Sequence, residues 1–126
     1  MKVYRVEHRE TGKGPWTHDY SRPWSLDATD MPTPWNDIWF DKRPSAASRL
    51  EWRYAFPDLD RFMRWMSARD CMNLDTFGFV LACYKVPRRS VRCGGEQALF
   101  NATRAQRLVL YPLPVARARV HDTGSL

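Results

Sequence analysis

The chain has 126 residues, a formal net charge of +6 and 44% hydrophobic residues, which suits one globular domain with a single core. No apolar run reaches the roughly 18 residues of a membrane span, and the N-terminus lacks the apolar region of a signal peptide, so we expect a cytoplasmic protein without membrane contact. Three cysteines without CxxC spacing and three histidines argue against a disulfide framework and against a metal site.

Positive charge is concentrated in the second half of the chain. Residues 1–60 carry nine Lys and Arg against ten Asp and Glu, whereas residues 61–126 carry eleven against four. Sixteen of the twenty basic residues are arginine, whose planar fork of donors suits phosphate groups. This asymmetry favours a nucleic acid or another anionic partner, with Arg88, Arg89 and Arg92 as the candidate contact. An arginine-rich composition alone would give the same pattern, so both interpretations stay open.

The first residues predict a strand followed by a turn. Residues 2–7 alternate as a strand does, and Arg5 lies among apolar neighbours, so its charge must reach solvent or meet an anion. Pairing near Glu7 explains Arg5 as well as a bound ligand does. Gly12 and Gly14 then predict a turn whose backbone is free to approach a ligand.

A long irregular segment follows over residues 16–44, with four tryptophans and several prolines. Its prolines exclude a long helix, and its aromatic content is too high for a disordered segment. We expect an ordered loop that wraps the domain with its indole rings beneath it. Core filling explains the tryptophans more simply than stacking on a ligand. A short helix is predicted at 45–49 and a strand at 51–56.

A helix is predicted over residues 57–69. Pro57 suits the first helical position, and Asp58 and Asp60 suit the positive N-terminal end of a helix. Apolar residues recur at the spacing of one helical face, so we expect them to be buried against the sheet. These residues are Leu59, Phe62, Met63 and Met66.

The predicted centre of the sheet is the strand at residues 79–86, which is apolar on both alternating faces. Gly94–Gly95 and then Glu96–Gln97 lead into a further short strand. This polar pair marks either a site or simply a hairpin with a solvent-exposed edge. Residues 107–113 predict a last strand at an edge of the sheet, because Pro112 cannot donate a ladder hydrogen bond.

These elements predict an α+β protein. Residues 1–114 would form a single domain, with a mixed or antiparallel sheet, one main helix and the Trp- and Pro-rich loop. Residues 115–126 are polar and are expected to form a flexible tail.

Three segments carry a family resemblance: the opening VYRVEH, the central GFVLACYKV and the later EQALFNATRAQRLVLYPL. Their layout resembles the ADP-ribosyltransferase fold, and the two later segments are similar to the ending of poly-ADP-ribose-polymerase-type domains. The HxT, HG and Ser-Thr-Ser motifs of known branches are absent. The opening and the stretch GGEQALF also resemble small phage and prophage proteins.

The resemblance implies a site for NAD. Cleavage of the nicotinamide–ribose bond develops positive charge on the sugar, which a carboxylate stabilises. Glu96 is the candidate for that catalytic role, Gln97 is the alternative position, and Arg5 would hold the pyrophosphate. We expect Arg5 and Glu96 to share one cleft. The other residues expected around NAD are Gly14, Trp16 and Tyr54.

Two functions from different classes follow. The first is an ADP-ribosyltransferase-like phage protein that binds NAD and modifies a macromolecule of the host or of its defence. The second is a non-catalytic phage inhibitor that blocks a host protein or nucleic-acid complex through its basic surface. Neither hypothesis calls for a metal.

Overall fold

The structure of the protein is a computed structural model. It describes residues 1–16, 23–27, 37–38, 44 and 51–126. Most of the predicted Trp- and Pro-rich loop and the helix predicted at 45–49 lie outside these residues. The protein is an α+β domain, as predicted, with three α-helices and two three-stranded antiparallel sheets in the described part. No described helix has the length and apolar character needed to cross a membrane.

The first sheet has β3 (Phe79–Lys85) at its centre, between β1 (Lys2–His8) and β6 (Gln106–Pro112). Both neighbours run antiparallel to β3. The predicted central strand is therefore confirmed, and its apolar residues on both faces are explained because both faces are covered. The last strand lies at an edge, also as predicted.

The second sheet contains β2 (Trp52–Ala55), β5 (Ala98–Asn101) and β4 (Val91–Cys93), with β5 in the middle. The three-residue strand β4 was not predicted. It forms a hairpin with β5. A hairpin is therefore present at the diglycine segment, but the expected solvent-exposed edge is wrong, because β5 lies between β2 and β4 and Gln97 is 2% exposed. The two sheets meet where Tyr4 and Phe56 exchange backbone hydrogen bonds of 2.9 and 2.6 Å.

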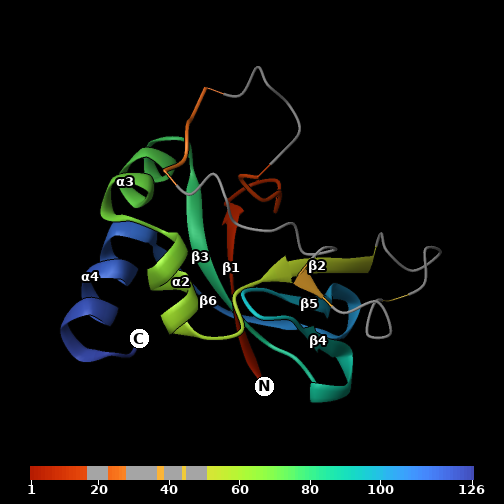
Figure 1. Ribbon diagram of the computed structural model, residues 1–126. Helices are drawn as coiled ribbons and strands as arrows, with labels where there is room; N and C mark the ends of the chain where they lie inside the picture. The colour runs from red at the N-terminus through yellow and green to blue at the C-terminus, as the bar shows by residue number, and fades with distance from the viewer. Residues whose placement is uncertain (17–22, 28–36, 39–43, 45–50) are drawn as a thin grey trace.

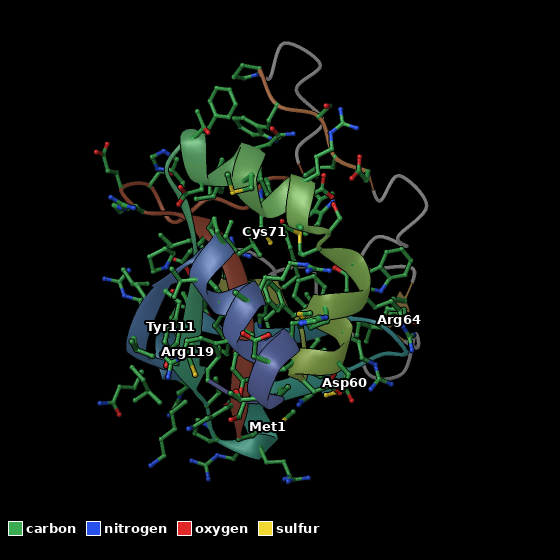
Figure 2. All side chains as sticks on the ribbon, turned by 90° about the vertical axis from the view of Figure 1, so that its left-hand side faces the viewer. Met1, Asp60, Arg64, Cys71, Tyr111 and Arg119 are labelled. Carbon is green, nitrogen blue, oxygen red and sulfur yellow. The ribbon has the colours of Figure 1, made fainter. Side chains whose placement is uncertain are left out.

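All three α-helices lie on one side of the first sheet, and the second sheet lies on its other side (Figure 1). The helices are α2 (Leu59–Trp65), α3 (Ala68–Thr76) and α4 (Leu113–Thr123). Figure 2, viewed from the helical side, shows α4 lying across the sheet with α2 and α3 beside it. The described residues also include two short 3₁₀ turns, η3 (Arg88–Ser90) and η4 (Ala102–Arg104).

The single helix predicted at 57–69 is two helices. Asp58 caps α2 by accepting a 2.8 Å hydrogen bond from the Arg61 amide, as its acidic start suggested. The chain is extended at Met66, and Ser67 then caps α3 by accepting from the Asp70 amide. A residue with a capping side chain thus starts a new helix in place of continuing the old one.

The helical stripe is buried only in part. Phe62 and Met66 are fully buried, whereas Leu59 and Met63 are partly exposed. The break after Trp65 explains the difference, because Met66 leaves the helix and turns into the core while Met63 packs at its margin.

The prediction of a flexible tail at 115–126 is wrong, because helix α4 occupies most of these residues. Pro114 lies in the first turn, where the missing amide costs nothing. Gly124 ends the helix in the left-handed conformation, with φ of 74°. Its buried residues, Leu113, Ala116 and Val120, recur at helical spacing.

Two apolar clusters lie on opposite faces of the first sheet. On the helical face, Val6 and Leu81 pack against Phe62 and Leu74. On the other face, Val3 and Val86 pack against Phe100 and its neighbours from the second sheet. Since β1 alternates, its residues 3, 5 and 7 all face the second sheet. This alternation places Arg5 and Glu7 between the two sheets.

Met66→Ala should lower the free energy of unfolding by about 2–5 kcal/mol, because it leaves a cavity beneath α2 and α3. Met63→Ala should cost less, since its side chain is partly exposed. Met72→Ala, at a position 60% exposed, is the matched control and should change stability little. Urea unfolding monitored by circular dichroism measures all three. An equal loss for Met66 and Met72 would contradict this packing.

Candidate functional site

A groove of about 340 Å³ opens between the two sheets. Its walls come from β1 and the turn after it, from β2 and β5, and from β3 and β6. Four arginines and two glutamates line it, together with smaller polar and apolar groups. The lining residues are Arg5, Glu7, Arg9, Glu10, Thr11, Gly12, Arg53, Tyr84, Phe100, Ala102 and Arg107.

Arg5 forms the floor of this groove and is only 4% exposed. Its guanidinium donates to the carbonyl oxygens of Tyr54 at 2.8 Å and Gly12 at 3.0 Å. It also lies 4.8 Å from the centre of the Tyr54 ring. Burial lowers the pKa of Arg5, while Tyr54 and Glu7 act in the opposite direction. Arg5 therefore ties β1 to β2 and to the turn.

Glu7 supplies the buried counter-charge for Arg5. Its carboxylate is 3.7 Å from Arg5 Nε and 3.8 Å from the half-exposed Arg107. The Tyr84 hydroxyl donates a short hydrogen bond to the same carboxylate. The interpretation in which Arg5 pairs near Glu7 is thus confirmed.

The turn residues expected around a cofactor do lie beside Arg5. The ring of Trp16 contacts the ring of Tyr54 edge-on, with centroids 5.8 Å apart. A Cβ atom at Gly14 would overlap the Tyr54 hydroxyl, so this glycine allows the backbone to pass close to Tyr54. Arg5, Gly14, Trp16 and Tyr54 therefore form one cluster, in which the Tyr54 ring is covered by protein groups.

Glu96 belongs to a different cluster. Its carboxylate accepts hydrogen bonds from Arg64 at 2.7 and 3.0 Å and from the Trp65 indole at 2.7 Å. The carboxylate of Asp37 accepts from the backbone amides of Glu96 and Gln97. Asp37 thereby fixes the turn, and a Cβ atom at Gly94 would collide with it. The role of Asp37 had no signal in the sequence, since it acts across some sixty residues.

The structure does not place Arg5 and Glu96 together in a cleft. Glu96 is not among the residues that line the Arg5 groove, and the described partners of its carboxylate come from α2. Gln97, the residue directly before β5, is 2% exposed. The expected pairing of one cation and one carboxylate around NAD is therefore not found between these two residues.

A second cationic feature lies at the end of the first sheet, where Met1 is labelled in Figure 2. Lys2 and Lys85 are directly opposite each other in the β1–β3 register, and Arg88 and Arg89 follow in η3. All four are exposed; we call them the basic end. None of them forms an ion pair within the part of the chain that the structure describes.

Arg92 differs from these four cations. Its guanidinium donates to the carbonyl oxygens of Arg89 and Val91 and lies 5.4 Å from the centre of the Trp52 ring. Its side chain thus holds η3 against the second sheet. Of the three arginines expected to contact nucleic acid, Arg88 and Arg89 point to solvent and Arg92 supports them.

A family model described as the bacteriophage T4 Y00F protein matches residues 1–113. The chain belongs to the Y00F family. No curated protein and no solved structure matches it. The matched range covers both sheets, α2 and α3, and ends where α4 begins.

The chain therefore belongs to a phage protein family, in agreement with the resemblance to small phage proteins. The ADP-ribosyltransferase part of that resemblance receives no support from these matches. Among the described residues, no group of three His, Cys, Asp or Glu side chains is arranged to hold a metal ion.

Gly14→Ala should lower the free energy of unfolding by about 1–3 kcal/mol, because the new methyl group overlaps the Tyr54 hydroxyl. Tyr54→Phe alone should cost little, since this buried hydroxyl has no hydrogen-bond partner of good geometry among the described residues. The double variant should recover part of the loss. Urea unfolding of the four proteins gives the coupling, and strict additivity would refute the contact.

The Tyr84 hydroxyl should make stability fall at high pH. Burial first, and then the hydrogen bond to Glu7, raises the pKa of Tyr84 to about 12. An unfolded tyrosine loses its proton near pH ~10, so the native state keeps the proton longer and stability declines between about pH 10 and 12. Tyr84→Phe should flatten this decline. Unfolding free energies measured from pH 9 upward test it.

Proposed function

We propose that the protein is a phage-encoded, non-catalytic binding protein that engages nucleic acid, or a complex containing it, through the basic end. The observation that carries this proposal is a set of exposed cations, Lys2, Lys85, Arg88 and Arg89, that form no ion pair with any residue the structure describes. Two lysines directly opposite each other on neighbouring strands repel and lower stability. Phosphate groups of a bound nucleic acid would attract both lysines and offset their mutual repulsion.

The charge of the surrounding sequence supports the same conclusion. From Phe79 to His121 the chain carries eight Lys and Arg residues and one acidic residue, Glu96. That carboxylate is already neutralised by Arg64. Within this segment, a polyanion that approaches β3, η3 and β6 therefore meets no described carboxylate that lacks a cationic partner. The positive charge of the segment would attract the polyanion at long range and steer its encounter with the protein.

The basic end is also held in place by the fold. The Val86 amide donates to the Met1 carbonyl at 2.8 Å, which fixes the end of β1 against the residues that lead into η3. The Arg92 guanidinium fixes Arg89 from the other side. Positioned cations lose less conformational freedom on binding than cations on a mobile segment.

The ADP-ribosyltransferase-like hypothesis remains a prediction. It requires NAD to be bound near Arg5 and a macromolecular target to be modified by Glu96 or Gln97. The contacts favour it less, because Arg5 donates to Tyr54 and Gly12 and because Glu96 is engaged by Arg64 and Trp65. A thermal-shift titration with NAD and labelling of host extracts with NAD test it directly.

Binding of single-stranded and duplex oligonucleotides should weaken steeply as salt rises, because each phosphate contact releases counterions. The variant K85Q/R88Q/R89Q should bind more weakly at low salt, and its salt slope should be smaller by roughly 2–3. A control variant, K13Q/R69Q/R119Q, removes the same charge from exposed positions elsewhere. Fluorescence anisotropy measures both. Equal losses in the two variants, or no binding by the wild type at low salt, would reject the proposal.

A further inference from the structure

We infer that the nucleic acid bound at the basic end is single-stranded and that one of its unpaired bases stacks on the indole ring of Trp52. This inference rests on the proposed function and deepens it, because it names the form of the nucleic acid and adds a contact that carries no charge. Trp52 is the first residue of β2, and described contacts join it to the basic end.

Arg92 is the link between Trp52 and the basic end. Its guanidinium lies over the Trp52 ring, 5.4 Å from the ring centre, and donates a 2.8 Å hydrogen bond to the carbonyl oxygen of Arg89. The ring is therefore held beside η3, from which Arg88 and Arg89 reach solvent. Proteins that bind single strands combine cations that contact the phosphates with aromatic rings on which bases stack. Trp52 and the basic end place these two kinds of group side by side.

Trp52 and Arg92 lie on the face of the second sheet that is turned away from the first sheet. Phe100 of β5 packs against Val3 of the first sheet, and alternate residues of a strand point to opposite faces. Trp52 and Arg92 are paired with the two β5 residues on either side of Phe100, so their side chains project on the other face. A base stacked on this ring leaves the packing between the two sheets unchanged.

The core does not use the Trp52 ring as it uses the other described tryptophans. Trp16, Trp24 and Trp65 all pack against the apolar cluster on the helical face, and the indole N–H groups of Trp24 and Trp65 donate to protein oxygens. Trp52 belongs to neither apolar cluster of the described residues and is partly exposed. Its indole N–H donates to no residue that the structure describes. Part of this side chain is therefore accessible to a ligand.

The stacking contact requires a single strand. In a duplex each base is paired and stacked between its neighbours, so a protein ring reaches a base face only at the cost of unstacking. A duplex would thus meet the cations of the basic end and gain nothing from Trp52. A single strand brings its phosphates to Lys85, Arg88 and Arg89 and turns a base toward the indole ring. Because Arg92 already holds that ring, little conformational freedom is lost on binding.

Oligonucleotides with abasic positions test the inference, because they keep every phosphate and lack the bases. In fluorescence anisotropy, the wild-type protein should bind an intact single strand about tenfold more tightly than an abasic strand or a duplex of the same length. Trp52→Leu should lose that advantage, while its affinity for the abasic strand and the duplex changes less than about twofold. Its salt slope should equal that of the wild type because no charge is removed, whereas K85Q/R88Q/R89Q lowers the slope.

Two further variants separate stacking from a general effect on the fold. Phe77→Leu removes a ring that is 37% exposed, from a residue that precedes β3 and therefore lies at the opposite end of this strand from Lys85. It should change single-strand binding by less than about twofold. Trp52→Phe keeps an aromatic ring and should retain most of the single-strand affinity. Urea unfolding checks that all three variants keep the fold.

The outcomes separate this inference from the proposed function. Equal binding of intact and abasic strands by the wild type, or equal losses in Trp52→Leu and Phe77→Leu, would overturn the inference. In that case, binding that still weakens with salt and in K85Q/R88Q/R89Q would leave the proposed function intact. Absence of binding to every oligonucleotide at low salt would overturn both.

Discussion

The buried guanidinium of Arg5 is the constraint on which the arrangement of the two sheets depends. It projects from β1 toward the second sheet and donates hydrogen bonds to the carbonyl oxygens of Tyr54 on β2 and Gly12 in the turn. A buried charge of this kind is costly unless it is paired, and Glu7, two residues along the same strand, supplies the opposite charge. With the sheets joined in this way, a polar groove remains at one end of their interface, beside the apolar packing around Phe100.

Most of the strands could be predicted because alternation and apolar runs are local signals. Two helical features were missed for different reasons. The sequence Ser67-Ala-Arg-Asp70 has the spacing of a capped helix start, but the continuous apolar stripe through Met66 outweighed it. In α4, the polar composition and its arginines suggested a tail, although Leu113, Ala116 and Val120 had helical spacing and Gly124 marked an end. Both signals were present and could have been used.

The candidate site was predictable only where its residues are neighbours in sequence. Arg5 and Glu7 stand two apart on one strand, and their pairing could be proposed directly. Tyr84, Arg53 and Arg107 join them through sheet pairing over long separations, which no local pattern reports. For Glu96 the local pattern was misleading. This polar residue follows a diglycine and was expected to be catalytic, but its carboxylate binds Arg64 and Trp65 of α2. Local patterns found charged residues on strands, but not the partners that define their role.

The most direct test of this account is the free energy of unfolding of Arg5→Met, measured in urea with and without NAD. If Arg5 joins the two sheets, its removal leaves Glu7 buried without its main partner and should cost about 3–5 kcal/mol, and NAD should not alter the difference. If Arg5 instead serves a cofactor, the variant should be as stable as the wild type without NAD, while the wild type alone should be stabilised when NAD is added. That second result would contradict the account.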